Sequence, residues 1–264
     1  MKIKFSIVTI TFNSERTLQE TLESVLAQNY RPIQYIIQDG ESTDATLSIV
    51  ENYKDRFAKE EIELIVVSEK DKGISDAFNK GLSKADGDII GIINSDDKLC
   101  ESALEIISEN YKKNIDIYYG DCVIFNDRNN SQYVAIPKFS KKPKLLNEKM
   151  PLFHPSCFIS RETYERYGVY DVNIKLCMDR ELLLRIYRGG GEFLYIHRSL
   201  SYYREDGINQ MNYKKRASEN MEISIKYGMN PMEAEIRRIY FKVHDSIWKL
   251  IQELGLERIF HKKL

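Results

Sequence analysis

Apolar strands and amphipathic helices alternate over the first 113 residues, and this alternation constrains the fold more than any other feature of the chain. Residues 3–12 are rich in Ile, Val, Thr and Phe, as is typical of a strand buried on both faces. Residues 14–28 then carry apolar side chains at helical spacing. The pair of patterns recurs with strands at 34–38, 63–68 and 88–94 and helices at 44–53, 74–84 and 101–113. We therefore expect right-handed crossovers and an α/β fold whose mostly parallel central sheet is flanked by helices.

The pattern changes after about residue 115. Short strands are predicted at 117–126, 132–136 and 192–196, and short helices at 160–167 and 179–187. From residue 211 the pattern is helical to the end, with a break marked by Gly228 and Pro231. We expect a catalytic domain over residues 1–210 and a C-terminal helical extension over residues 211–264.

Composition limits the location and the partners of the protein. The 39 Lys and Arg residues against 40 Asp and Glu give a formal charge of −1, which argues against nucleic acid as a partner. The N-terminal run lacks the pattern of a signal peptide, and no stretch approaches the roughly 20 apolar residues of a membrane span. Four widely spaced cysteines form no metal-binding motif and are expected to be buried free thiols. These features predict a cytoplasmic protein.

Two adjacent carboxylates, Asp96 and Asp97, follow the apolar run 89–93. In α/β sheets ligands bind beyond the carboxyl ends of the strands, where this pair is expected. Hard oxygen ligands there suit Mg²⁺ or Mn²⁺ shared with a substrate phosphate. The alternative is that both residues only form the turn into the next helix.

Polar residues also follow the three preceding strands. They are Thr11 and Asn13 after the first, 38–44 after the second and 68–73 after the third. Together with Asp96 and Asp97 they predict a nucleotide site, in which an acid accepts from the base and a metal binds the diphosphate. The chain has neither a Gly-x-Gly-x-x-Gly motif nor a Walker loop, so metal rather than a glycine-rich loop is expected to bind the phosphates.

The ordered series of these motifs resembles the family 2 glycosyltransferases with the GT-A fold, in particular the bacterial branch that builds surface polysaccharides. The resembling segments are 6–13, 39–44, 71–73 with Asp76 and Asn79, 85–88, 94–97, 154–156, 167–171 and 179–185. The likeness spans residues 3 to about 205. It implies an inverting enzyme that uses a nucleotide-diphospho-sugar donor, with a UDP-sugar as first choice, and a glycan or lipid-linked acceptor.

The resemblance also implies roles for individual residues. The donor-binding positions are Thr11, Asn13, Asp39, Lys72, Asn79 and Asp96. Asp39 is implied to accept from the base, Asp96 to serve ribose and metal, and Asp97 to be the preferred direct ligand of Mn²⁺ or Mg²⁺. One departure concerns Asn94, which stands where the family often has Asp and leaves the metal geometry open.

Asp179 matches the family's catalytic base, although the usual Glu-Asp pair is here Met178-Asp179. An inverting displacement needs a carboxylate on the acceptor side to take the hydroxyl proton. The alternative is that Asp179 only caps the helix over 180–187. Glu181 is a competing base, weaker because residues two positions apart on a helix point in different directions.

Two further residues are expected near the acceptor or the diphosphate. His154 precedes Pro155 in an extended segment, and the alternative is a buried structural imidazole. Arg204 lies in a stretch, 202–207, that resembles the family's segment closing over the donor, and it could meet a phosphate or form an ordinary surface ion pair.

Residues 236–264 carry an apolar stripe at helical spacing together with seven Lys and Arg against three Asp and Glu. Such a helix could lie on an anionic membrane near a lipid-linked acceptor, at the inner face of the plasma membrane. It could instead pack on the core of its own chain or on a second subunit of a homodimer.

Two other enzyme classes fit the residues less well. An aspartate-nucleophile phosphohydrolase needs Asp at position 94, and a uridylyltransferase needs a Gly-rich loop after the first strand, where this chain has 11–14. The non-enzymatic alternative is an assembly subunit that binds a nucleotide sugar without turnover, and Met178 in place of Glu is its only support.

Overall fold

The structure, a computed structural model, describes residues 2–205 and 213–253. Within them nine strands form one sheet in the order β3-β2-β1-β4-β8-β6-β9-β5, with β7 paired to β6. The strands are β1 (Phe5–Thr11), β2 (Ile33–Asp39), β3 (Ile62–Ser68), β4 (Ile89–Ile92), β5 (Lys98–Leu99), β6 (Ile117–Asn126), β7 (Ser131–Ala135), β8 (Cys157–Ser160) and β9 (Phe193–Arg204). The α-helices are α1 (Leu18–Leu26), α2 (Thr46–Lys59), α3 (Ile74–Leu82), α4 (Ala103–Glu109), α5 (Arg161–Tyr167), α6 (Met178–Arg188), α7 (Tyr213–Lys226) and α8 (Pro231–Glu253).

The first four strands, β1 to β4, pair in parallel, as the alternating pattern predicts. Side chains along β1 and β2 point alternately to two core clusters. Phe5 and Ile7 pack with α1, α2 and α4 on one face, whereas Val8 packs with α3 and α6 on the other. Because both faces are covered, β1 and β2 are buried almost throughout, and the predicted α/β class is confirmed.

The second half of the sheet is mixed. β8 runs antiparallel between β4 and β6, and β9 runs parallel to β6. The sequence did not predict β8, and it predicted only 192–196 of β9. Consequently Tyr202–Arg204, expected in a closing segment, belong to β9 and pair with β5 and β6. Residues 206 and 207 of that segment lie outside the described residues.

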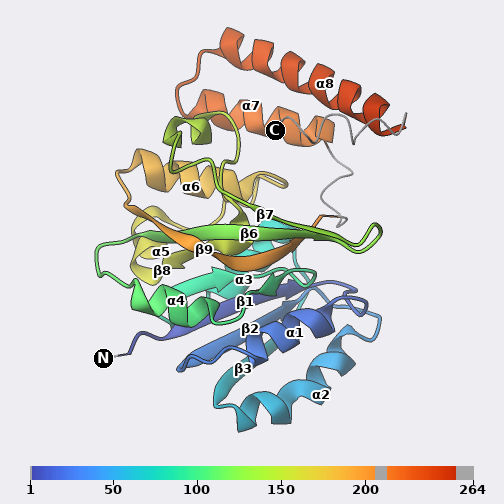
Figure 1. Ribbon diagram of the computed structural model, residues 1–264, viewed down its shortest axis with the longest axis vertical. Helices are drawn as coiled ribbons and strands as arrows, with labels where there is room; N and C mark the ends of the chain where they lie inside the picture. Colours follow the sequence, from blue (N-terminus) through green and yellow to red (C-terminus); the bar gives the residue numbers. More distant parts are fainter. Residues whose placement is uncertain (1, 206–212, 254–264) are drawn as a thin grey trace.

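The C-terminal extension is helical, as predicted. Gly228, with φ of +92°, and Pro231 separate α7 from α8. Figure 1 shows α7 and α8 at one end of the molecule, beyond α6, with β3 and α2 at the opposite end. No described helix is long and apolar enough to cross a membrane. All four cysteines are free and buried, which confirms that expectation.

Candidate active site

A cavity of about 1250 Å³ lies where β1, β2, β3 and β4 end. One side, here called the strand-end wall, consists of the loops after those strands: Phe12, Asn13, Ser14, Arg16, Thr17, Gly40, Glu41, Lys70, Asp71, Gly73, Asn94, Ser95 and Asp96. The other side, here called the helical wall, consists of Met150, Leu152, Phe153, His154, Pro155, Lys175, Leu176, Cys177, Met178, Asp179, Arg180, Arg216 and Asn220. The cavity therefore lies at the sheet edge where α/β proteins bind ligands.

The ten predicted site residues divide between the cavity and its supports. Those that line the cavity are Thr11, Asn13, Asp96, His154, Asp179 and Arg204. Those outside its lining are Asp39, Lys72, Asn79 and Asp97. The fold thus brings residues from five separate segments to one cavity and places the other four behind its walls or beside them.

The two adjacent carboxylates after β4 differ in environment. Asp96 lines the cavity, whereas Asp97 is 1% exposed. The backbone N–H of Arg204 donates to Asp97 Oδ1 at 3.1 Å, and the Asn94 amide donates to Oδ2 at 3.1 Å. Burial, and next the charge of Asp96, raise the pKa of Asp97 well above its ordinary value. Asp97 therefore joins the loop after β4 to β9, while Asp96 borders the open space.

Asp39 supports the strand-end wall from inside. It is fully buried, and its Oδ1 accepts from the hydroxyls of Thr11 (2.8 Å) and Ser42 (2.5 Å). Its Oδ2 accepts from Ser42 N (2.9 Å) and Ser68 Oγ (2.7 Å). Burial alone would raise the pKa of Asp39, but these hydrogen bonds outweigh it and the pKa is lowered. One carboxylate thus joins the ends of β1, β2 and β3.

Asn13 and Asn79 each join two segments. Asn13 has a left-handed backbone (φ of 50°), and its Oδ1 accepts from Thr43 N at 2.9 Å. The Asn79 amide donates to Tyr170 O at 2.8 Å and accepts from Tyr170 N at 3.0 Å, so it ties α3 to the segment before α6. Lys72 is exposed. Of these three residues, Asn13 alone reaches the cavity lining.

Asp179 lies in the first turn of α6 and is half-buried. Cys177 is the N-cap residue of α6, so Asp179 is not. The Cys177 side chain makes no hydrogen bond to the helix. Its Oδ1 accepts the backbone N–H of Arg180 at 2.7 Å. A carboxylate in this position is favoured by the positive end of the helix dipole. This geometry leaves Asp179 both stabilised locally and at the cavity surface.

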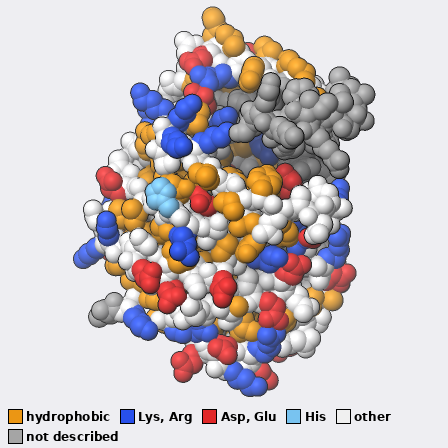
Figure 2. All heavy atoms as spheres, viewed as in Figure 1, with side chains coloured by type: hydrophobic (Ala, Val, Ile, Leu, Met, Phe, Trp, Pro, Cys, Tyr) orange, Lys and Arg blue, Asp and Glu red, His pale blue; other side chains and the backbone are white. Residues whose placement is uncertain are grey.

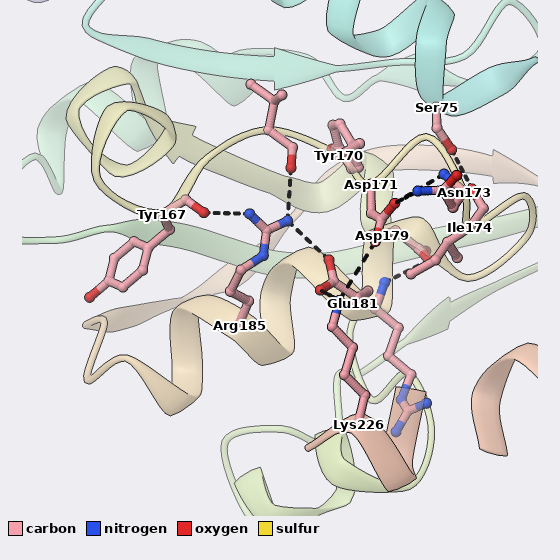
Figure 3. Close-up of polar contacts among 12 residues, drawn as sticks. Ser75, Tyr167, Tyr170, Asp171, Asn173, Ile174, Asp179, Glu181, Arg185 and Lys226 are labelled. Atoms are coloured by element: carbon pink, nitrogen blue, oxygen red, sulfur yellow. Dashed lines mark hydrogen bonds and ion pairs between the residues drawn. The ribbon is translucent and has the colours of Figure 1, made fainter. Parts of the chain in front are cut away.

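Glu181, the competing candidate, is committed elsewhere. It is 1% exposed and accepts from Tyr227 Oη (2.6 Å), Lys226 Nζ (3.0 Å) and Arg185 Nη2 (3.0 Å). Figure 3 shows Glu181 between Arg185 and Lys226. Burial would raise the pKa of Glu181, but these partners bring it below its ordinary value. Glu181 is therefore a structural anion that ties α6 to the end of α7.

His154 and Arg204 close two corners of the cavity. The His154 ring stacks on Phe78 at 5.5 Å, and its Nε2 lies 2.9 Å from Tyr170 Oη. Burial lowers the pKa of His154, and the charge of Asp179 opposes part of that shift. Arg204 is 7% exposed, and its guanidinium pairs with Glu20 at 3.2 Å and with Asp127. Arg204 is thus a buried ion-pair centre at the cavity edge rather than a surface residue.

Three residues of α7 at or behind the cavity were missed at the level of sequence. Arg216 and Asn220 line the cavity from α7, and Glu219 of α7 bonds the segment just before Asp179. They lie about 40 residues after α6 begins, in what the sequence suggested was a separate extension. No local motif marks them, because their role depends on how α7 packs.

Two solved structures with a similar fold identify the fold class of this chain. TarS of S. aureus (residues 1–349, in complex with UDP-GlcNAc) matches with a TM-score of 0.69 and 16% identity, covering 90% of this chain and 71% of TarS. The mannosyltransferase PcManGT from Pyrobaculum calidifontis, in complex with GDP-Man and Mn²⁺, matches with a TM-score of 0.66 and 17% identity, covering 90% and 70%. The predicted GT-A glycosyltransferase fold is confirmed.

The family follows from sequence. The profile of glycosyl transferase family 2 matches residues 6–168, and this chain belongs to that family. An uncharacterized glycosyltransferase of Mycobacterium tuberculosis is 31% identical over 189 residues, which cover 68% of this chain and 67% of that protein. A PGL/p-HBAD biosynthesis glycosyltransferase of Mycobacterium bovis is 24% identical over 241 residues, covering 89% and 90%.

The protein is therefore a transferase enzyme. The non-enzymatic alternative rested on Met178, and this residue has a structural reason to be apolar. It is 5% exposed and packs in the core cluster that contains Leu182 and Ile223. An apolar side chain before Asp179 thus serves packing and gives no support to a subunit without turnover.

Proposed function

We propose that this enzyme moves a sugar, with inversion, from a nucleotide-diphospho-sugar to a hydroxyl of a glycan or lipid-linked acceptor in surface polysaccharide biosynthesis. The observation that carries the proposal is that Asp96, from the loop after β4, and Asp179, from the first turn of α6, line the same cavity. Relatives add support, because a relative is named for PGL/p-HBAD biosynthesis and similar folds bind UDP-GlcNAc or GDP-Man. A UDP-sugar remains our first choice of donor.

In this proposal the nucleotide lies along the strand-end wall. Thr11 and Asn13 border it directly, because both line the cavity. Asp39, whose oxygens already accept four hydrogen bonds, acts by holding the loops after β1, β2 and β3 in place. Asn79 plays the corresponding role for the segment at Tyr170. Lys72, exposed beside the cavity, is left with at most a peripheral contact.

The acidic residues after β4 fit a divalent cation shared with the donor. Asp96 supplies a carboxylate at the cavity surface, and Asp97 supports its loop from behind. Among the residues that the structure describes, no three His, Cys, Asp or Glu side chains are grouped to hold an ion. A carboxylate at the cavity surface suits Mg²⁺ or Mn²⁺, which accept one or two carboxylates and complete their shell with water and phosphate oxygens. When bound, the ion would neutralise charge on the departing diphosphate.

Asp179 is the proposed base. The acceptor oxygen forms a bond to the anomeric carbon while the bond from that carbon to the diphosphate oxygen breaks, and the acceptor proton passes to the Asp179 carboxylate. His154, with its lowered pKa, is neutral at pH 7 and therefore forms no ion pair that would occupy the Asp179 carboxylate. Phe78 and Tyr170 hold the imidazole at the edge of this wall.

The test is a panel of UDP-, GDP- and dTDP-sugars with Mn²⁺, in which nucleotide release is measured for the wild type and for Asp179→Asn. We expect one nucleotide class to be released in the presence of metal and an acceptor. The matching nucleotide should also raise the thermal unfolding temperature. A protein whose unfolding temperature responds to no nucleotide in the presence of metal has no donor site of this kind.

We also propose that α8 contacts an anionic membrane that presents the acceptor. Ile236, Ile239, Tyr240, Val243 and Ile247 are all more than half exposed and recur at helical spacing along one face. Figure 2 shows hydrophobic side chains along the upper edge of the molecule, over α8. Residues 236–264 have a formal excess of four positive charges, which complements anionic lipid. α7 packs against α8 and also lines the cavity, so it connects the two.

Liposome co-sedimentation of the full-length protein tests this contact. An Ile236→Ser/Val243→Ser/Ile247→Ser variant should partition less onto vesicles containing phosphatidylglycerol than the wild type does. High salt should weaken the binding of the wild type to these vesicles. Equal partitioning of both proteins contradicts membrane contact. Loss of a dimer in the variant, seen by analytical ultracentrifugation without vesicles, would instead assign the stripe to a second copy of the chain.

A further inference from the structure

The segment that leads into α6 is held by a residue from a different helix. Glu219 of α7 is 9% exposed, and its Oε1 accepts the backbone N–H of Lys175 at 3.0 Å. Its Oε2 accepts the N–H groups of Leu176 at 2.7 Å and Cys177 at 3.1 Å. Cys177 itself, the N-cap, offers no side-chain hydrogen bond to the helix. A buried carboxylate thus accepts three successive N–H groups of residues 175–177, next to the helix end where the dipole favours negative charge.

The residue after Asp179 is held by the same helix. The guanidinium of Arg180 donates to Asn220 O (2.8 Å), Asn220 Oδ1 (3.0 Å) and Ser224 Oγ (2.8 Å), all on α7. Its Nε donates to Leu146 O at 3.0 Å. Asp179 therefore lies between two points of attachment to α7, one through Glu219 and one through Arg180. A shift of α7 relative to α6 would move the backbone on both sides of the Asp179 carboxylate.

We propose that Glu219 is a positioning residue: it fixes residues 175–177 so that the first turn of α6 presents Asp179 to the acceptor. This inference rests on the proposed function, in which Asp179 is the base. It makes α7 part of the active site, although α7 lies beyond residues 6–168, which match the family profile. Effective proton transfer needs the base within hydrogen-bonding distance of the acceptor hydroxyl, so a displacement of about 1 Å can lower the rate by as much as 100-fold.

Glu219→Gln is the variant that tests the proposal, because it keeps the size of the side chain but places an amide against the three N–H donors. Glu222→Gln is the matched control, since Glu222 lies three residues further along α7, is exposed and accepts only from Ser218 Oγ at 3.2 Å among the described contacts. We expect Glu219→Gln to lower kcat by about 10- to 100-fold with little change in the KM for the donor. The control should retain wild-type kcat and KM.

A double variant separates positioning from general stabilisation. If Glu219 acts through Asp179, adding Glu219→Gln to Asp179→Asn should lower kcat little further. Independent losses that multiply in the double variant would overturn the proposal. Glu219→Asp, which keeps the charge on a shorter side chain, should fall between Glu219→Gln and the wild type, whereas wild-type kcat in a folded Glu219→Gln protein would also overturn it.

The same set of variants distinguishes failure of this inference from failure of the proposed function. A wild-type kcat in Asp179→Asn would disprove the assignment of Asp179 as the base. A lowered kcat in Asp179→Asn together with a wild-type kcat in Glu219→Gln would disprove only the positioning role of Glu219. If Glu219→Gln does not fold, hydrogen exchange of the wild-type amides 175–177 provides a second measurement. We expect those amides to exchange slowly and to lose protection in Glu219→Asp, and rapid exchange in the wild type would contradict the positioning role.

Discussion

The strand-end wall and the helical wall of the cavity are built in different ways. In the strand-end wall, acidic and amide side chains bond one another or adjacent loops, as Asp39 does with Thr11, Ser42 and Ser68. In the helical wall, the groups that support Asp179 come from α7, some 40 residues later in the chain. The first wall is thus stabilised by contacts among its own strand ends. The second depends on the docking of the C-terminal helices.

This difference predicts which substitutions affect chemistry and which affect stability. Substitutions of Asp96 and Asp179, which line the cavity, should alter turnover more than folding. Residues behind the lining should alter the free energy of unfolding, because their removal leaves buried donors without acceptors. Three predictions test this division by comparing a lining residue with a supporting one or a supporting one with an exposed control, and a fourth tests the charge interaction between the lining residues Asp179 and His154.

The largest effect is expected for Asp179→Asn. The amide cannot take a proton, so kcat should fall by about 10²- to 10⁴-fold, whereas the KM for the donor and the thermal unfolding temperature should stay near wild-type values. Glu181→Gln provides the comparison on the same helix. It should lower the unfolding temperature, because Glu181 is buried among Arg185, Lys226 and Tyr227. Equal nucleotide release by the wild type and Asp179→Asn would disprove the base assignment.

The second prediction concerns the two carboxylates after β4. Asp96→Asn should raise the Mn²⁺ concentration needed for half-maximal turnover more than Asp97→Asn does, because Asp96 lines the cavity and Asp97 acts through its loop. Substitution of a residue that supports a metal ligand typically lowers metal affinity by about 10- to 100-fold. The measurement is a metal titration of turnover for each variant. A larger shift for Asp97→Asn would reverse the roles assigned to the two residues.

Asp39→Ala should destabilise the fold by about 3 kcal/mol, because the hydroxyls of Thr11, Ser42 and Ser68 lose a buried acceptor. Urea denaturation measures the effect, with the exposed Asp55→Ala as a control that should stay within about 0.5 kcal/mol of the wild type. Since hydrogen bonding lowers the pKa of Asp39, its stabilisation is present above the ordinary Asp value of 3.8 and is lost as pH falls below it. An Asp39→Ala protein as stable as the wild type would contradict the supporting role.

The parallel half of the fold was predictable because its signals are local. An apolar run followed by a helical stripe specifies a strand and its crossover, and the handedness rule then fixes the arrangement. β8 was missed because it has four residues and pairs with strands about 40 or more positions away. β9 was cut short because polar residues between His197 and Arg204 hid a strand that shifts register against β6.

The site was predictable to the same degree. Residue types at strand ends indicated which segments meet, since parallel strands end at one edge of a sheet. They did not indicate which carboxylates face the cavity, because Asp39 and Asp97 differ from Asp96 only in how neighbouring loops fold over them. Glu219 could not be found from sequence at all, since an acidic residue on an amphipathic helix is ordinarily a solvated one.

The smallest effect concerns the charge of His154. Burial lowers its pKa and the negative charge of Asp179 raises it again in part, so Asp179→Asn should lower the pKa of His154 further. Nuclear magnetic resonance of the imidazole protons measures this, with His154→Gln identifying the resonance. A group with a lowered pKa stabilises the fold above its ordinary value of 6.5 and ceases to do so as pH falls, at no more than about 1.4 kcal/mol per pH unit. The wild type should therefore lose stability between pH 7 and pH 5 more steeply than His154→Gln. If the pKa of His154 rises or stays constant in Asp179→Asn, the charge of Asp179 does not act on His154, and the electrostatic coupling within the helical wall is disproved.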